Sequence, residues 1–167
     1  MLRHSTFDTP VGPFTVVATE AGAVRAAGFT TDVPELMRLI HPRLTAPVEA
    51  DDDVGPVRDA VRDYLDGDLT ALDAIVVEQY TRGEFMQHAW DVMREIKPGA
   101  PVTYTRYAEL SGRPAAIRAA AAACARNAVA LILPCHRVLR TDGTLGGYRW
   151  GLPVKEWLLK HEAGPAA

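Results

Sequence analysis

A run of five apolar residues constrains the fold of this chain more than any other feature of its sequence. Val129 to Leu133 is wholly apolar and is bounded by Asn127 and Pro134. Such a run predicts a buried segment whose ends are held in place. The residues that follow it, Cys135 and His136, are therefore expected to lie at a fixed position in the fold.

The Cys135-His136 pair has the chemistry of a nucleophile and its base. A thiol with a pKa of about 8.5 is mostly protonated at neutral pH, and a nearby imidazole, cation or helix N-terminus converts it to a thiolate. Consecutive side chains often diverge, so His136 is expected to act through a water molecule. The dipeptide alone is also compatible with a purely structural role.

The length and composition indicate one ordinary domain or two small ones. The chain has 167 residues, of which 48% are hydrophobic, enough for a packed core. No apolar stretch approaches the roughly 20 residues of a membrane helix, so no membrane partner is expected. Met1 to Thr6 leads directly into a strand-like pattern and lacks the apolar region of a signal peptide. We therefore expect a cytoplasmic protein.

Cysteine and histidine usage argues against disulfides and metal sites. The two cysteines are Cys124, in an alanine-rich stretch, and Cys135. Two cysteines cannot form a closed structural zinc site without histidine, and the five histidines show no ligand spacing. No metal and no cofactor are expected.

Charge is distributed unevenly along the chain. The net charge is −3, but residues 1–83 carry −7 and residues 84–167 carry +4. A basic half beside an acidic half is compatible with a nucleic-acid-binding face on the second half. Ordinary scatter of charges would produce the same numbers.

The first 80 residues predict a structural α/β domain without catalytic chemistry. Thr6 to Phe29 has the alternation and the turn residues of antiparallel strands. Two helices are expected next, one opened by Pro34 and one from Pro56 to Leu65. Leu72 to Tyr80, with Ile75-Val76-Val77 at its centre, predicts a further strand.

A linker near residues 81–83 predicts a boundary between domains of residues 1–80 and 81–167. Thr81 and Glu84 are spaced as a capping box at the start of a helix from Phe85 to Ile96. Trp90 is expected on a face next to the buried one. The expected buried residues are Phe85, Ala89, Val92, Met93 and Ile96.

Two further helices joined by a short glycine-containing turn form a helix-turn-helix pattern. They are expected from Thr103, as a cap, to Gly112 and from Ala115 to Arg126, with Pro114 starting the second. Asn127 is expected to close the second helix, because asparagine tolerates the left-handed backbone found at helix ends. The alanine-rich second helix is a slim rod that could approach another surface closely, although a core helix can have the same composition.

With these features, the chain resembles the O6-alkylguanine-DNA alkyltransferases, also called methylated-DNA–protein-cysteine methyltransferases. The resemblance extends through roughly Phe85 to Glu162 and more weakly through the first half. It implies an α+β fold of two small domains, an N-terminal α/β domain of the ribonuclease H-like type and a mainly helical C-terminal domain with a helix-turn-helix. The motifs that carry it are Pro134-Cys135-His136-Arg137-Val138, Gly146-Gly147-Tyr148, Lys155, Leu158-Leu159 and Glu162.

The resemblance implies DNA repair by direct transfer of the alkyl group of O6-alkylguanine to Cys135, with O4-alkylthymine as a second substrate. The damaged nucleotide would be flipped out of double-stranded DNA through the minor groove by a monomeric protein. The thioether product is not hydrolysed, so each molecule would act once. The implied catalytic roles are Cys135 as nucleophile, His136 as its base, Glu162 as partner of the imidazole, Tyr104 as donor to guanine and Asn127 as the tie between helix and active-site segment.

The resemblance also implies which residues contact DNA and which form the substrate pocket. Arg118 would insert into the base stack in place of the flipped nucleotide. Arg113, Ala119 and Arg126 would lie against the DNA beside it. The loop from Arg140 to Gly151 would close the pocket. The implied pocket residues are Val138, Gly146, Gly147, Tyr148, Arg149 and Trp150.

The chain departs from the family pattern in this loop. Arg149-Trp150-Gly151 follows Tyr148 where the family usually has a Gly-Gly pair, and Met86 stands where glutamine often follows Phe85. Trp150 at the rim is expected either to narrow the pocket and exclude bulky adducts or to stack on the base.

Two other functions are compatible with these residues. The alkyltransferase-like proteins bind the same lesions without chemistry, but they lack the cysteine that this chain has at Cys135. A cysteine hydrolase using Cys135 and His136 would release its product and turn over. The sequence has no pattern for an oxyanion site, which argues against that class.

Overall fold

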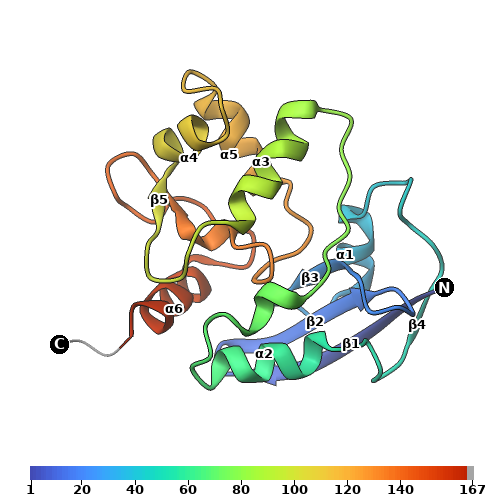
Figure 1. Ribbon diagram of the computed structural model, residues 1–167. Helices are drawn as coiled ribbons and strands as arrows, with labels where there is room; N and C mark the ends of the chain where they lie inside the picture. The colour runs from blue at the N-terminus through green and yellow to red at the C-terminus, as the bar shows by residue number, and fades with distance from the viewer. Residues whose placement is uncertain (165–167) are drawn as a thin grey trace. The chain divides into compact units, whose positions relative to one another are not determined.

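The structure, a computed structural model, describes residues 1–164 and divides into two compact units (Figure 1). The first unit contains Met1–Tyr80 and Ala128–Ile132, and the second contains Thr81–Asn127 and the chain from Leu133 onward. The break after Tyr80 lies at the linker expected from the sequence. Ala128–Ile132 belongs to the first unit, whereas the expected second domain includes it.

A four-stranded sheet forms the core of the first unit, in the order β3-β2-β1-β4. The first three strands pair antiparallel, as expected from the strand-like segments and turn residues between Thr6 and Phe29, and β4 pairs parallel with β1. In β2, Phe14 to Ala18 are all buried, which explains why this strand is almost continuously apolar. The strands are β1 (Leu2–Thr9), β2 (Gly12–Ala18), β3 (Val24–Gly28) and β4 (Val48–Ala50).

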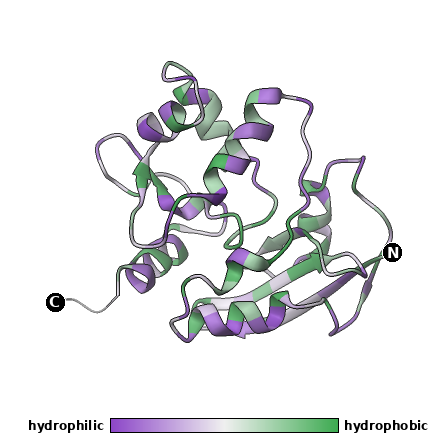
Figure 2. Cartoon of the chain, viewed as in Figure 1, coloured by the Kyte–Doolittle hydropathy of each residue, from purple (hydrophilic) through white to green (hydrophobic). Residues whose placement is uncertain are grey.

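The two helices expected in this unit are present. α1 (Val33–Leu39) begins where the Asp32 carboxylate accepts a hydrogen bond from the Glu35 amide at 3.0 Å. α2 (Val57–Leu65) buries its apolar side chains along one face, and Figure 2 shows hydrophobic and hydrophilic residues both present on this short helix. The amphipathic spacing of the sequence therefore predicted both elements.

The strand expected from Leu72 to Tyr80 is wrong. Residues Ala71–Ala74 form a 3₁₀ helix, and Val77 makes only an isolated parallel bridge with Val24. Leu72 and Ile75, three residues apart, are buried, whereas Val76 is 60% exposed. Spacing by three matches a 3₁₀ turn, in which residues i and i+3 share a face, and the β-branched composition concealed it.

The Ala128–Ile132 segment is buried, as its apolar run predicts. It adds a bridge between Val129 and Ala27 to the sheet of the first unit. Leu131 has a φ of +70°, and the Ile132 amide donates to the Ala130 carbonyl at 2.8 Å. These features form a γ-turn of the rare, strained kind. The chain therefore turns sharply just before it reaches Cys135.

The second unit is mainly helical. Its two short strands, β5 and β6, pair in parallel with Val102 opposite Val138. No helix in the part of the chain that the structure describes is long and apolar enough to cross a membrane. The elements are α3 (Glu84–Arg94), β5 (Val102–Thr103), α4 (Tyr104–Leu110), α5 (Ile117–Ala125), a 3₁₀ turn (Cys135–Arg137), β6 (Val138–Leu139) and α6 (Leu152–Ala163).

Three details expected for α3 are wrong. Of the residues expected to be buried, Phe85 and Val92 are only half-buried. The capping box is wrong, because Gly83 is the N-cap and the Gln87 side chain accepts from the Thr81 amide at 3.0 Å instead. Trp90 lies on the buried face and is only 6% exposed, because its indole N–H donates to the Ala123 carbonyl at 2.9 Å. The small residues of α5 leave room for the indole.

Two expectations for α5 are also wrong. The helix begins at Ile117 rather than near Pro114, because the Ala116 amide bonds to Arg113 in a turn before the helix. At the other end, Arg126 is the C-cap, and Asn127 does not adopt the left-handed conformation that was expected. The expected cap of α4 is present, since the Thr103 hydroxyl accepts from the Arg106 amide at 3.1 Å.

Candidate functional site: a thiol in a pocket of the second unit

Two local features place Cys135. Pro134 has φ −83° and ψ 63°, and the Cys135 amide donates to the Leu133 carbonyl at 2.9 Å, which together form an inverse γ-turn. The Asn127 side-chain amide donates to the same Leu133 carbonyl, also at 2.9 Å. Asn127 therefore joins the end of α5 to the segment that carries the thiol, the role the resemblance implied for it.

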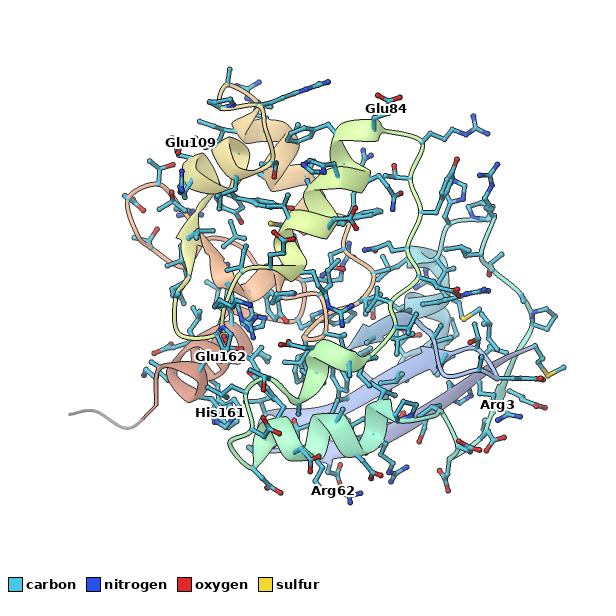
Figure 3. All side chains as sticks on the ribbon, in the orientation of Figure 1. Arg3, Arg62, Glu84, Glu109, His161 and Glu162 are labelled. Carbon is cyan, nitrogen blue, oxygen red and sulfur yellow. The ribbon has the colours of Figure 1, made fainter. Side chains whose placement is uncertain are left out.

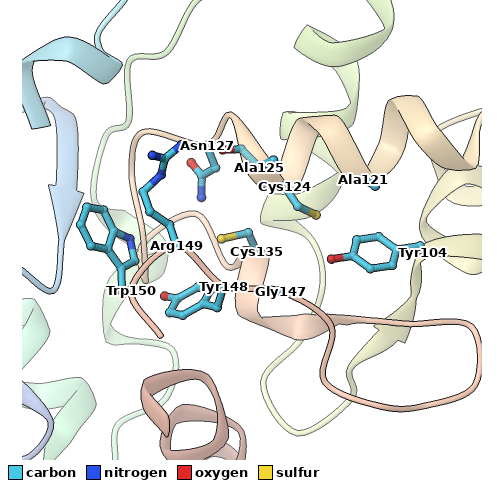
Figure 4. A pocket seen from close by; sticks show the side chains of 10 residues that line it. All are labelled: Tyr104, Ala121, Cys124, Ala125, Asn127, Cys135, Gly147, Tyr148, Arg149 and Trp150. Atoms are coloured by element: carbon cyan, nitrogen blue, oxygen red, sulfur yellow. Dashed lines mark hydrogen bonds between the residues drawn. The ribbon is translucent and has the colours of Figure 1, made fainter. Parts of the chain in front are cut away.

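Cys135 lines a cavity of about 320 Å³, a size typical of small-molecule sites. Figure 4 shows Tyr104 reaching in from one side and Trp150 lying on the other, with the two cysteines between them in this view. Alanines of α5 form an apolar wall, and residues 147–150 complete the lining. The lining residues are Tyr104, Ala121, Cys124, Ala125, Asn127, Cys135, Gly147, Tyr148, Arg149 and Trp150.

Opposing effects act on the Cys135 thiol. Burial raises its pKa, because a thiolate is costly to hold away from water. The hydrogen bond with Asn127 and the positive charges of Lys155 and Arg149 act in the other direction, although burial prevails. The thiol of the free protein is therefore a neutral group surrounded by groups that favour its ionisation.

Tyr104 presents a hydrogen-bond donor to the same pocket. Burial raises its pKa to about 12, and the nearby thiols of Cys124 and Cys135 act in the same direction. The phenol is therefore protonated at neutral pH. Gly146, with φ +70°, packs against it so closely that an added Cβ would lie 3.4 Å from the Tyr104 ring and 3.3 Å from Arg140 Cγ. A side chain at position 146 would crowd the phenol as well as strain the backbone.

His136 and Arg137, which follow Cys135 in the sequence, form a second cluster with Glu162. Glu162, on α6 and labelled in Figure 3, accepts from His136 Nε2 at 2.8 Å and from Arg137 Nε and Nη2 at 2.8 and 2.9 Å. Arg137 Nη1 also donates to the Ile96 carbonyl at 2.7 Å. All three side chains are almost wholly buried. The paired hydrogen bonds from Arg137 fix the carboxylate in the plane of the guanidinium.

The charges of this cluster follow from its contacts. Burial alone would raise the pKa of Glu162, but hydrogen bonds from His136 and Arg137 lower it to about 2. Burial lowers the pKa of His136 and outweighs the effect of Glu162. The cluster is therefore an Arg137–Glu162 ion pair with a neutral imidazole. A neutral His136 that donates from Nε2 keeps Nδ1 as an acceptor, and Nδ1 is buried with no protein partner.

Lys155 binds the backbone of the pocket loop. Its side chain is almost wholly buried, and Nζ donates to the carbonyls of Val138 at 2.8 Å and Gly147 at 3.3 Å. Burial lowers the pKa of Lys155, which the thiols oppose. At the other end of the loop, residues 140–143 form a turn in which the Gly143 amide donates to the Arg140 carbonyl at 2.8 Å.

The exposed arginines expected to contact DNA lie on α5 and at its ends. Arg118 and Ala119 are exposed in the first turn of α5, which buries Ala120 and Ala123. Arg126 is exposed at the other end of this helix. Arg113 precedes the helix, is exposed, and places its guanidinium 5.5 Å from the centre of the Phe85 ring.

The structure gathers most, but not all, of the expected pocket residues. Gly147, Tyr148, Arg149 and Trp150 line the cavity with Cys135, whereas Val138 and Gly146 are buried and do not line it. His136 and Glu162 also lie outside its lining. In residues 1–164 no group of three or more metal-binding side chains is clustered.

Three residues near the site had no role assigned from the sequence. Lys155 and Arg137 were identified only as parts of motifs, although a lysine between Val154 and Leu158 on a helix signals a buried charge. Cys124 lines the same cavity as Cys135, and no sequence signal pairs the two. Its pKa is raised well above the ordinary value by burial, so this thiol stays neutral.

Comparison with known proteins places the second unit in a described family. Residues 84–164 match the family model of the 6-O-methylguanine DNA methyltransferase, DNA binding domain. The methylated-DNA–protein-cysteine methyltransferase of Salmonella typhimurium is 37% identical over 158 residues, which cover 92% of this chain and 91% of the relative. The bifunctional transcriptional activator/DNA repair enzyme Ada of Escherichia coli is 52% identical over 79 residues. That match covers 47% of this chain and 22% of Ada, so the similarity concerns about a fifth of Ada.

Solved structures of similar fold cover almost the whole chain. The crystal structure of the Mycobacterium tuberculosis O6-methylguanine methyltransferase has a TM-score of 0.79 and 25% identity, covering 100% of this chain and 97% of that one. The crystal structure of M. tuberculosis OGT in complex with DNA has a TM-score of 0.80 and 27% identity, covering 96% and 92%.

Proposed function

Because the chain belongs to the family of methylated-DNA–protein-cysteine methyltransferases, we propose that it repairs DNA by moving the alkyl group of O6-alkylguanine irreversibly to Cys135. O4-alkylthymine is the second substrate of this proposal. The observation that carries it is the position of the Cys135 thiol in a cavity that also holds the protonated Tyr104 phenol. A flipped base could meet a nucleophile and a proton donor there at once.

The transfer balances without a cofactor. The Cys135 thiolate attacks the alkyl carbon, an S–C bond forms, and the bond from that carbon to O6 breaks with its electron pair passing to guanine. Tyr104 donates a hydrogen bond or proton to the base as this charge develops. The product is a thioether and a repaired guanine, so each protein molecule acts once.

His136 is proposed to take the thiol proton. Its neutral ring has an accepting Nδ1, and a bridging water molecule would connect that atom with the thiol. The carboxylate of Glu162 then stabilises the imidazolium, while the ion pair with Arg137 keeps the carboxylate in place. Burial keeps the thiol protonated in the free protein. The thiol would therefore lose its proton only after the substrate has bound.

DNA is the proposed partner, bound through its minor groove by the second unit. We assign α4 and α5 to a helix-turn-helix in which Arg118 fills the place of the flipped nucleotide and Arg113, Ala119 and Arg126 lie along the DNA. The exposure of these residues and the +4 charge of residues 84–167 support this assignment. The first unit is proposed to be a ribonuclease H-like structural domain, which the strand order β3-β2-β1-β4 of its sheet supports. The protein is further proposed to be monomeric and cytoplasmic.

A labelled substrate separates this function from its alternatives. Duplex DNA with a labelled methyl group on guanine O6 should transfer label to the protein until one equivalent is bound, and then stop. A lesion-binding protein would retain the label on DNA. A cysteine hydrolase would release label continuously without saturating the protein.

A further inference from the structure

Arg149 connects the pocket loop with the end of α5. Its Nη2 donates to the Ala125 carbonyl at 2.9 Å, and Ala125 is the last residue of that helix. The same side chain lines the cavity that holds Cys135 (Figure 4). Arg149 therefore touches both walls of the pocket, the loop to which it belongs and the helix opposite.

The end of α5 depends on donors from outside the helix. The last four carbonyls of a helix lack partners within it. Here the backbone amide of Arg126 donates to the Ala122 carbonyl, and the Trp90 indole donates to the Ala123 carbonyl. The backbone amide of Asn127 donates to the Cys124 carbonyl at 3.3 Å, and the Arg149 side chain donates to the Ala125 carbonyl. A cation at this position is also favoured by the helix dipole. Arg149 thus completes the cap of the helix that bears Cys124 and Ala121 in the pocket.

The loop is held at a second point close by. Lys155 Nζ contacts the Gly147 carbonyl two residues before Arg149, and it also contacts Val138. Between these two anchors lies Tyr148, and beyond them Trp150, both in the cavity lining. Loss of the Arg149 side chain would remove the hydrogen bond between the loop and the end of α5, and the Lys155 contact with Gly147 would remain.

We propose that Arg149 is a positioning residue, which clamps the pocket loop to the end of α5 and keeps a positive charge beside the Cys135 thiolate. This inference deepens the proposed function and rests on it. The positive charges of Arg149 and Lys155 both favour ionisation of Cys135, and the effect of Lys155 is the larger. Because Arg149 is exposed at the pocket, contact with a DNA phosphate is the competing role that an experiment must separate.

The test compares wild type with R149A, R149K and the control K160A. Lys160 is an exposed cation on α6 paired with Glu156, so K160A removes the same charge without touching the pocket. Methyl transfer is measured by intact mass with O6-methylguanine in duplex DNA and with the free base. The pH dependence of Cys135 alkylation by iodoacetamide is followed by peptide mapping, which distinguishes it from Cys124.

R149A is expected to slow transfer about tenfold on both substrates and to raise the pH midpoint of Cys135 alkylation by about half a unit. R149K should restore the midpoint, because it keeps the charge, but restore the rate only in part. K160A should match wild type in both readouts. Loss confined to duplex DNA, or an unchanged midpoint and rate in R149A, would overturn the clamp. Failure of the wild type itself to accept a methyl group would instead contradict the proposed function.

Discussion

His136 Nε2 lies 2.8 Å from Glu162 Oε2, with both side chains almost wholly buried. This contact makes His136 a donor toward Glu162 and leaves Nδ1 as its accepting atom. Arg137 binds the same carboxylate through two nitrogen atoms, so the negative charge of Glu162 is balanced before His136 gains a proton. When His136 gains a proton, the cluster changes from a net charge of zero to +1, and the hydrogen bond with Glu162 stabilises the imidazolium.

The cluster predicts an acid-dependent loss of stability. The pKa of Glu162 is lowered from 4.5 to about 2 in the folded protein, so its contribution is complete above 4.5 and disappears as the pH falls toward 2. Glu162→Gln should therefore be less stable than wild type at pH 7 by at most about 3 kcal/mol.

Urea unfolding of wild type and Glu162→Gln at pH 7, 5 and 3 measures this contribution. The difference between the two proteins should shrink below pH 4.5 and should be constant above it. A difference that stays the same down to pH 3 would show that the ion pair with Arg137 does not depress the pKa of Glu162.

Lys155 should set the reactivity of the thiol. Lys155→Met removes a buried positive charge that lowers the pKa of Cys135, so the pH midpoint of Cys135 alkylation should rise by about one unit. Alkylation at neutral pH should slow accordingly. Lys160→Met, which removes an exposed charge from the same helix, is the matched control. Equal profiles for the two variants would mean that Lys155 acts only by holding the loop.

Arg118 is expected to matter only in double-stranded DNA. Arg118→Ala should slow methyl transfer from duplex DNA by about tenfold or more, because no side chain would then fill the gap that the flipped nucleotide leaves in the base stack. Transfer from the free base should not change, and neither should the thermal midpoint, because Arg118 is exposed. Equal losses on duplex and free base would remove the base-flipping role of this residue.

Trp150 should decide which adducts enter. Trp150→Gly removes the indole from the lining of the cavity. The rate with O6-benzylguanine relative to O6-methylguanine should then rise by about tenfold, since steric exclusion is worth one to a few kcal/mol. A ratio that falls would indicate instead that Trp150 stacks on the base and contributes to binding.

Much of the architecture could be predicted from local patterns. The antiparallel strands and the two helices of the first unit follow from alternation and from apolar spacing, which depend on nearby residues only. Buried Val129–Leu133 was likewise predicted from its composition. The strand predicted at Leu72–Tyr80 is wrong because its β-branched residues are compatible with a strand and also with an irregular segment. Only the burial of Leu72 and Ile75, three residues apart, distinguishes the 3₁₀ turn.

The site could be predicted in part for a related reason. Cys135 and His136 are adjacent, so their motif is local, and the family resemblance supplied Tyr104, Asn127 and Glu162. The long-range contacts were not visible in the sequence. Arg149 meets Ala125 24 positions away, and Lys155 meets Val138 17 positions away. Such contacts depend on how loops and helices come together, which local pattern does not encode.

The central claim is that Cys135 accepts an alkyl group from guanine O6 and keeps it. The most direct test is the intact mass of the protein after incubation with duplex DNA carrying O6-methylguanine, beside Cys135→Ala. One increment of about 14 Da, the mass of a CH₂ group, that maps to Cys135 and is absent in the variant, is the predicted result, with DNA binding retained by both. No increment in a wild-type protein that still binds the lesion would contradict the account.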